Sequence, residues 1–198
     1  MDLFKLMQDV LRYFLLLTPF FGLLMFLALT RTFSTRKRRI DATKIWIACS
    51  VLGTLILFYG NEIFSFLGIT LAAFRIGVGT VLLIDGVKLV NGKSAKSQDD
   101  IGDIAIVPMT IPVTVGPATI GALIVSGTDA ANVEAKVHEI IAFCLGCFLI
   151  WLMLYLATTI ERLVGTQIII ILSKLTGLYL ASLASGLIMS GVSASLNL

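Results

Sequence analysis

Charged residues are scarce in this sequence, and their scarcity argues against a soluble globular protein. Only 14% of the 198 residues are charged and 58% are hydrophobic, whereas about a quarter of an average soluble domain is charged. The longest polar stretch, residues 91–103, is too short to fold as a separate soluble domain. We therefore predict an all-α membrane protein whose residues 1–198 form a single transmembrane domain.

Residues that catalytic and metal sites need are also scarce. The only histidine, His138, lies in a charged segment where we expect it to be solvated, and no set of metal ligands accompanies it. The sequence has no G-x-x-x-x-G-K-[ST] loop, no H-E-x-x-H, and no Ser–His pair or carboxylate dyad at matched depth. These absences argue against an ATPase and an intramembrane enzyme, and we expect no metal and no cofactor.

Cysteines and basic clusters give no sign of redox chemistry or of nucleic-acid binding. Cys49, Cys144 and Cys147 all lie in apolar runs, so the Cys144-x-x-Cys147 pattern is expected to be a packing feature. The net charge of +3 is small, which argues against a nucleic-acid partner. The basic cluster of residues 36–39 lies in a short loop, where a topology determinant is favoured over a site for nucleic acid or anionic lipid.

The apolar residues form six runs that approach the length needed to cross a bilayer core of about 30 Å. The runs cover residues 13–30, 45–60, 69–90, 104–126, 140–158 and 167–192. The basic residues on one face are Arg31, Arg36, Lys37, Arg38, Arg39, Lys44, Lys93, Lys96 and Arg162; those on the other are Lys5, Arg12 and Lys136. The richer face is predicted to be cytoplasmic, so both termini lie outside a bacterial or archaeal cytoplasmic (inner) membrane. We expect no cleavable signal peptide.

Prolines are few, and all of them interrupt the first and fourth apolar runs. Pro19 lies in the first run, and Pro108, Pro112 and Pro117 lie in the fourth. Proline removes a helix hydrogen bond and clashes with the preceding turn. Irregular backbone at membrane depth survives only where protein covers it or a wet cavity receives it. Spans 1 and 4 are therefore predicted to be discontinuous, a pattern that is typical of a transporter binding site.

The two halves of the chain, approximately residues 10–92 and 104–194, resemble each other weakly and in the same order. A unit of three spans must enter the membrane from opposite sides in the two halves, so inverted repeats are predicted. Helix ends at the two breaks would offer N–H and C=O groups to a small zwitterionic amino acid. The matched segments are Thr18-Pro19 with Gly116-Pro117, residues 45–68 with 142–165, and residues 74–90 with 173–189.

Several segments resemble the MarC family, also called the small neutral amino acid transporter-like family. AIVPMTIPVTVGPATIGALI (105–124) resembles its A-I-V-P-x-A-I-P-x-x-x-G-P-G-A-I stretch, and FRIGVG (74–79) and KLTGLYLA (174–181) resemble two further characteristic helices. TPFFGLLMFLALT (18–30) resembles its D-P-x-G-N-x-P motif, with Thr18 where Asp is usual. The resemblance covers nearly the whole chain. It implies a six-span inner-membrane protein and, for some members, transport of glycine, alanine and related amino acids.

Candidate substrate-binding residues surround the two predicted breaks. Hydroxyls there either satisfy backbone groups that proline frees or bind a substrate, and Gly116 lets the chain bend without filling the pocket. The first set is Thr18, Pro19, Phe20, Phe21 and Gly22; the second is Thr110, Pro112, Thr114, Gly116, Pro117, Ala118 and Thr119. We expect a carrier of small polar solutes, such as small neutral amino acids, with membrane lipids around it. The alternative is a non-transporting membrane protein with a stress-response or interaction role.

Three charged residues inside the apolar runs are coupling candidates, because a charge within a span is a functional hypothesis by default. Arg75 and Lys174 lie shallow enough to snorkel or to form a structural pair instead. Asp85 either pairs with Lys88, three positions along the same helix face, or faces a cavity and binds a proton or cation. Small residues at Ala73/Gly77 and at Gly177/Ala181/Ser185 predict close helix packing.

Overall fold

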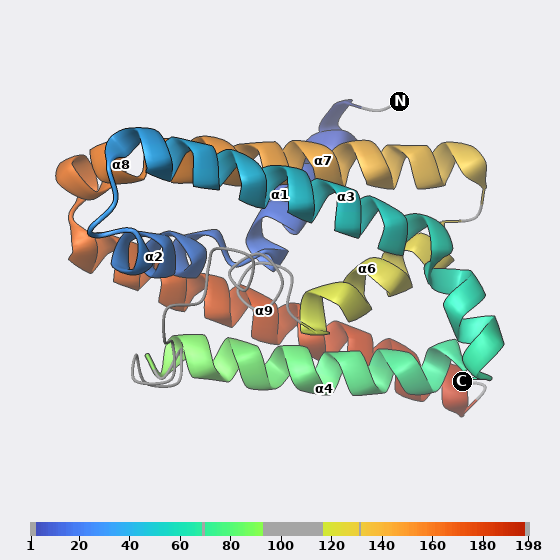
Figure 1. Cartoon of the computed structure of the whole chain (residues 1–198). Helices are drawn as coiled ribbons and strands as arrows, with labels where there is room; N and C mark the ends of the chain where they lie inside the picture. The colour runs from blue at the N-terminus through green and yellow to red at the C-terminus, as the bar shows by residue number, and fades with distance from the viewer. Residues whose placement is uncertain (1–2, 69, 93–116, 131, 197–198) are drawn as a thin grey trace.

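The computed structural model describes residues 3–68, 70–92, 117–130 and 132–196 (Figure 1). Within these ranges every regular element is an α-helix, which confirms the all-α prediction. The helices are α1 (Leu3–Leu16), α2 (Pro19–Leu29), α3 (Thr35–Leu67), α4 (Leu71–Val90), α6 (Pro117–Asp129), α7 (Val133–Tyr155), α8 (Ala157–Val164) and α9 (Thr166–Ser195).

Four of the predicted spans correspond to helices long and apolar enough to cross a membrane. These are Thr35–Gly60 within α3, the whole of α7, the whole of α9, and the bent pair of α1 and α2 taken as one span. The third predicted span forms α4, whose charges at Arg75, Asp85 and Lys88 exclude it from this apolar class. Residues 104–116 of the fourth predicted span lie outside the described residues, and the span continues as α6.

The first span breaks where Pro19 requires it. Proline disfavours the helical region for the preceding residue and is well suited to the first turn of a new helix. Thr18 accordingly leaves the helix with φ 48° and ψ 57°, and it is the only non-glycine residue with positive φ in the described ranges. The helices on either side of Thr18 meet at an angle of 43°. The discontinuity that was predicted for span 1 is confirmed.

The helices form two pairs along opposite edges of the molecule, with shorter helices between them (Figure 1). α3 packs beside α7 along one edge, and α4 packs beside α9 along the other. Between these edges, α6 contacts α3 and α4, whereas α2 contacts α7 and α9, and α1 packs mainly on α7. Fully buried core side chains are Tyr13, Leu17, Leu23, Phe26, Leu123 and Phe143.

Glycines allow α4 and α9 to approach each other at the level of their backbones. A Cβ at Gly86 would lie 2.7 Å from the Gly177 carbonyl oxygen, and a Cβ at Gly177 would lie 2.7 Å from the Gly86 carbonyl oxygen. The predicted packing role of Gly177 is therefore confirmed. A Cβ at Gly77 meets no described atom within 4 Å. The α4 side of the contact is instead made by Gly79 and Gly86, so the prediction for Gly77 was wrong.

Large apolar side chains point outward from the long helices at spacings of three or four residues. Such stripes are what a helix presents to lipid when its other face is packed against protein. The exposed residues include Ile47, Val51 and Leu55 on α3, Leu145, Phe148 and Leu152 on α7, and Ile171, Leu175 and Leu178 on α9.

Candidate functional site

The first group of predicted binding residues lies at the junction of α1 and α2. Pro19 and Gly22 are buried, while Thr18, Phe20 and Phe21 are partly buried. The Thr18 side chain makes no capping hydrogen bond to α2, and its carbonyl oxygen accepts from the Gly22 amide at 2.9 Å. Although Gly22 is buried, no described atom lies within 4 Å of a Cβ built there.

Only some residues of the second group of predicted binding residues lie within the described part of the chain. Thr110, Pro112, Thr114 and Gly116 lie outside the described residues. Pro117 is the first described residue of α6, and Ala118 follows it in the helix. Thr119 is buried, with 6% of its surface exposed. The substrate-binding role of both groups stays a prediction.

The coupling candidates have different environments. Arg75 forms an ion pair with Asp129 at the end of α6, and its Nε is buried without a hydrogen-bond partner among the described residues. Asp85 is exposed and lies 3.3 Å from the Lys88 ammonium on the same helix. Lys174 is exposed on α9, and no described residue forms an ion pair with it. Their coupling roles stay predictions.

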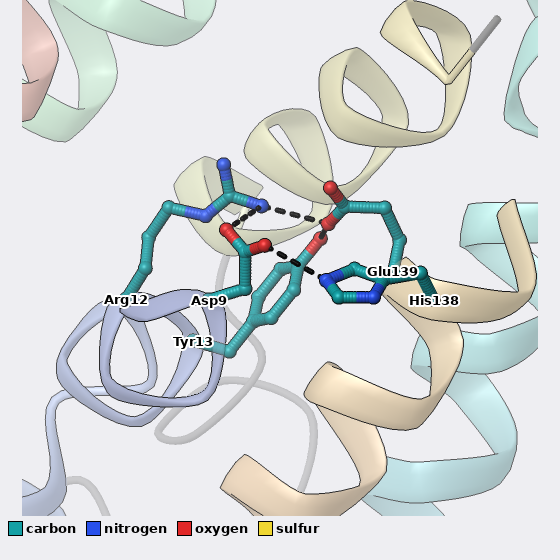
Figure 2. Close-up of polar contacts among 5 residues, drawn as sticks. All are labelled: Asp9, Arg12, Tyr13, His138 and Glu139. Atoms are coloured by element: carbon teal, nitrogen blue, oxygen red, sulfur yellow. Dashed lines mark hydrogen bonds and ion pairs between the residues drawn. The ribbon is translucent and has the colours of Figure 1, made fainter. Parts of the chain in front are cut away.

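A charged cluster that sequence reasoning missed joins α1 to α7 (Figure 2). Asp9, Arg12 and Tyr13 share one face of α1, because residues three or four apart are neighbours on a helix. On α7, His138 and Glu139 point toward them (Figure 2). We call these five residues the α1–α7 cluster.

The α1–α7 cluster is a connected network. A guanidinium nitrogen of Arg12 donates to Glu139 Oε2 at 2.7 Å and lies 3.5 Å from Asp9 Oδ1. The Tyr13 hydroxyl donates to the same Glu139 oxygen. On its other side, Asp9 Oδ2 lies 3.1 Å from His138 Nε2. Each carboxylate therefore has two partners. Asp9 has Arg12 on its own helix and His138 across the interface, whereas Glu139 has Arg12 and Tyr13, both from α1.

Local structure explains why these side chains meet. Asn132 caps α7 by accepting from the Ala135 amide at 2.8 Å, which fixes where the helix begins and which way His138 faces. About two turns beyond the cluster, Gly146 lets α1 approach closely, since a Cβ there would lie 3.2 Å from the Phe14 backbone nitrogen. Tyr13 then packs edge-on against Phe143 below the charges.

The expectation that His138 is solvated was wrong. Its side chain is only 15% exposed, and that of its partner Asp9 is 13% exposed. The physical reason is that α1 covers the first turns of α7, and the sequence gives no local sign of this contact. The one available signal was the pair Asp9 and Arg12, which places opposite charges on one face of an otherwise apolar helix.

Charge balance in the cluster depends on His138. Asp9 and Glu139 carry two negative charges against the single positive charge of Arg12. A neutral His138 leaves one excess negative charge, and a protonated His138 cancels it. Partly buried charges are stable when they are paired, so this arrangement suits proton binding. It does not suit a metal, because no group of three or more metal-ligating side chains is found in the described residues.

An open hollow of about 550 Å³ lies beside the cluster at the start of α7. It reaches His138 and Glu139, so solvent has a route to the edge of the network. The residues that line it are Lys5, Asn132, Val133, Glu134, Ala135, Val137, His138, Glu139 and Ile141.

A second buried carboxylate belongs to Asp41 on α3. The residue is 2% exposed, and its Oδ2 has no hydrogen-bond partner in the described part of the chain. A buried carboxylate without partners is costly in its charged form. Asp41 is therefore another place where a proton could bind.

Lipid-facing apolar stripes, spanning helices and a bent first span together define a polytopic integral membrane protein. The chain belongs to the MarC family: the model for MarC family integral membrane proteins matches residues 3–196. It is similar to a UPF0056 membrane protein of Methanocaldococcus jannaschii, with 29% identity over 191 residues that cover 92% of this chain and 93% of the relative. A UPF0056 membrane protein of Chlamydia trachomatis is 28% identical over 99% of this chain and 97% of its own length. No solved structure matches the chain significantly. The family resemblance inferred from the sequence is confirmed.

Proposed function

We propose that this protein is a secondary transporter of small polar solutes, such as small neutral amino acids, in the cytoplasmic membrane. It works by alternating access between two inverted halves of three spans each. The observation that carries the proposal is the break at Thr18-Pro19 in the first span, where Thr18 leaves the helix and Pro19 begins a new one. Interrupted spans of this kind form the substrate sites of carriers built from inverted repeats.

The break supplies groups that suit such a solute. α2 begins without a side-chain cap at Thr18, so the amides of its first turn are available to a carboxylate. In the second half, Pro117 is the first described residue of α6. A helix N-terminus there, as the inverted repeat predicts, would add to the preference for a ligand that carries a carboxylate, as an amino acid does.

Helix contacts support the inverted repeat. If α2, α3 and α4 correspond to α6, α7 and α9, exchanging the halves converts the α2–α7 contact into α6–α3 and the α2–α9 contact into α6–α4. All four contacts are present. The α3–α7 and α4–α9 pairs convert into themselves, and both are present as well. This pattern is what a pseudo-two-fold axis between the halves requires.

Contacts of the basic loop support the orientation with both termini outside. Arg38 Nε donates to the Thr30 carbonyl at 2.8 Å, and the Arg39 guanidinium lies 4.6 Å from the centre of the Tyr155 ring. Trp46, Trp151 and Tyr155 lie near this end of the bundle, as aromatic residues do at a membrane interface. The basic residues thus gather around one end, which the positive-inside rule assigns to the cytoplasm.

Uptake of labelled glycine, alanine and serine into proteoliposomes tests the proposal. We expect wild-type protein to accumulate or exchange at least one of them, and Gly22→Leu to remove this activity because leucine would add a large side chain to the first turn of α2, beside the break. Gly186→Leu is the matched control, because Gly186 is exposed on α9 and a Cβ there meets no described atom within 4 Å. Both variants should remain folded in detergent.

Two outcomes would contradict the proposal. The first is the absence of any solute movement by wild-type protein under every ion gradient tried. The second is equal transport by Gly22→Leu and Gly186→Leu. Either outcome would favour the non-transporting role in interaction or stress response.

A further inference from the structure

We propose that the Asp9–His138 pair is the site where this carrier takes up its coupling proton, so that a proton gradient drives accumulation of the solute. The inference rests on the proposed transport function and adds the identity of the coupling ion and its location. The ligand is a proton from the water in the hollow beside α7.

The Asp9–His138 pair connects the two halves of the molecule. Asp9 belongs to α1 in the first half, and His138 belongs to α7 in the second. A protonated imidazole attracts the Asp9 carboxylate and holds α1 against α7, whereas a neutral one does so more weakly. The proton therefore binds more tightly when the helices are together, and by linkage it favours that arrangement. Proton binding is thereby tied to a movement between the halves.

The chemistry of His138 suits the binding and release of a proton. Histidine is the side chain whose charge ordinarily changes near neutral pH. With Nε2–H donating to Asp9 Oδ2, the other ring nitrogen, Nδ1, forms no hydrogen bond with a described residue and can accept the incoming proton. After that step the imidazolium and Arg12 balance the carboxylates of Asp9 and Glu139.

Among the described residues, the other groups that face the pair are consistent with this balance. On α1 these are Arg12, Tyr13 and, at the rim of the hollow, Lys5; on α7 they are Glu139 and the rim residue Glu134. From α6, Ser126 faces the Tyr13 hydroxyl, and from α9, Tyr179 faces Arg12. Arg12 and Tyr13 are positioning residues, because they hold Glu139 and, through Arg12, Asp9 in place.

The Asp9–His138 pair is accessible to solvent from one side only. The hollow reaches His138 and Glu139 from the surface. Below the pair, Tyr13 and Phe143 are fully buried and pack against each other, so the route ends at the cluster. A proton can thus arrive from one face and can leave toward the other only after the helices rearrange, as coupling requires.

Rival coupling sites in the described residues fit less well. Asp85 pairs with Lys88 on its own helix, so this ion pair does not depend on the separation of two helices. Arg75 and Asp129 do connect α4 with α6, but the pair contains no group that ordinarily titrates near neutral pH. Asp41 is buried, and the hollow at the start of α7 does not reach it.

The experiment compares two kinds of transport in proteoliposomes. With a gradient of one pH unit and one proton per solute, wild-type protein should concentrate the solute about tenfold. His138→Gln and Asp9→Asn should abolish this accumulation and yet retain exchange of labelled for unlabelled solute without a gradient. A merely structural role would reduce both activities together. Glu134→Gln is the matched control, because it removes a carboxylate from the rim of the same hollow and should keep both activities.

A second measurement uses the wild-type chain and does not depend on how the variants fold. His138 is the only histidine, so a histidine-selective reagent modifies one position, provided that purification avoids a histidine tag. Modification should abolish accumulation and spare exchange. A pH-sensitive dye inside the liposomes should also report proton entry when the solute is added.

The outcomes separate this inference from the proposed function. If wild-type protein moves no solute, the proposed function itself fails. If it transports but neither moves protons nor responds to a pH gradient, the coupling inference fails and the transport function stands. If transport is proton-coupled but persists after modification of His138, or is lost only in Asp41→Asn or Asp85→Asn, the coupling site lies elsewhere and the assignment to Asp9–His138 is wrong.

Discussion

Replacing Gly86 by alanine tests whether direct backbone contact sets the distance between α4 and α9. The new Cβ would lie 2.7 Å from the Gly177 carbonyl oxygen and 2.9 Å from the Ala181 amide nitrogen. Both are backbone atoms, which no change of rotamer can move. A carbon and an oxygen in contact are about 3.3–3.6 Å apart, so the helices would have to separate by roughly 0.6–0.9 Å.

The expected effect follows from this displacement. Overpacking of a fitted interface costs about 1–3 kcal/mol. In a chain of this size each kcal/mol lowers the melting temperature by about 2–4 °C. Gly86→Ala should therefore melt about 2–12 °C below wild type when the helical circular dichroism signal is followed in detergent.

Gly77→Ala is the matched control for this experiment. It lies on the same helix, is exposed, and gains a Cβ that meets no described atom within 4 Å. Because alanine is favoured over glycine in a helix by up to about 1 kcal/mol, this variant should melt at or slightly above the wild-type temperature. The reasoning is refuted if Gly86→Ala is as stable as Gly77→Ala, since the two substitutions differ only in what the methyl group meets.

Three further predictions concern orientation, the charged cluster and the rival coupling site. A cysteine introduced at Ser34, which is exposed in the basic loop, should react in intact cells only with membrane-permeant thiol reagents; rapid labelling by an impermeant reagent would place this loop outside. Tyr13→Phe removes the hydroxyl that donates to Glu139 and should lower the free energy of unfolding by about 1.5–3 kcal/mol, whereas the exposed control Tyr59→Phe should change it little; equal effects would show that the buried hydrogen bond contributes nothing. Asp85→Asn should separate the two coupling sites in a proton-driven uptake assay: retained accumulation fits entry through the α1–α7 cluster, and lost accumulation fits Asp85.

Local chemistry made part of this structure predictable. Proline constrains its own backbone and that of the residue before it, so the break beside Pro19 could be located from the sequence alone. The apolar runs identified the helices for the same reason, because each run carries its own signal. For the second predicted break, the residues between 104 and 116 lie outside the described part, so that prediction remains to be tested.

Features that depend on contacts between distant segments could not be predicted in this way. His138 and Asp9 are 129 positions apart, and no local pattern shows that α1 covers the start of α7. Small residues recur on α4 in more than one register, so the sequence alone did not distinguish Gly77 from Gly79 and Gly86. Both errors arise because tertiary packing decides which face of a helix is buried.

Two of the contacts between the halves differ in how they resist movement. Along α4 and α9 the closest approaches at Gly86 and Gly177 are to backbone carbonyl oxygens of the facing helix. Small sliding of packed helices past each other is a recognised mode of movement at such an interface. The α1–α7 contact has discrete states, because its ion pairs are either formed or separated. A molecule with both contacts would slide along the α4–α9 interface and stop at positions set by the ion pairs between α1 and α7.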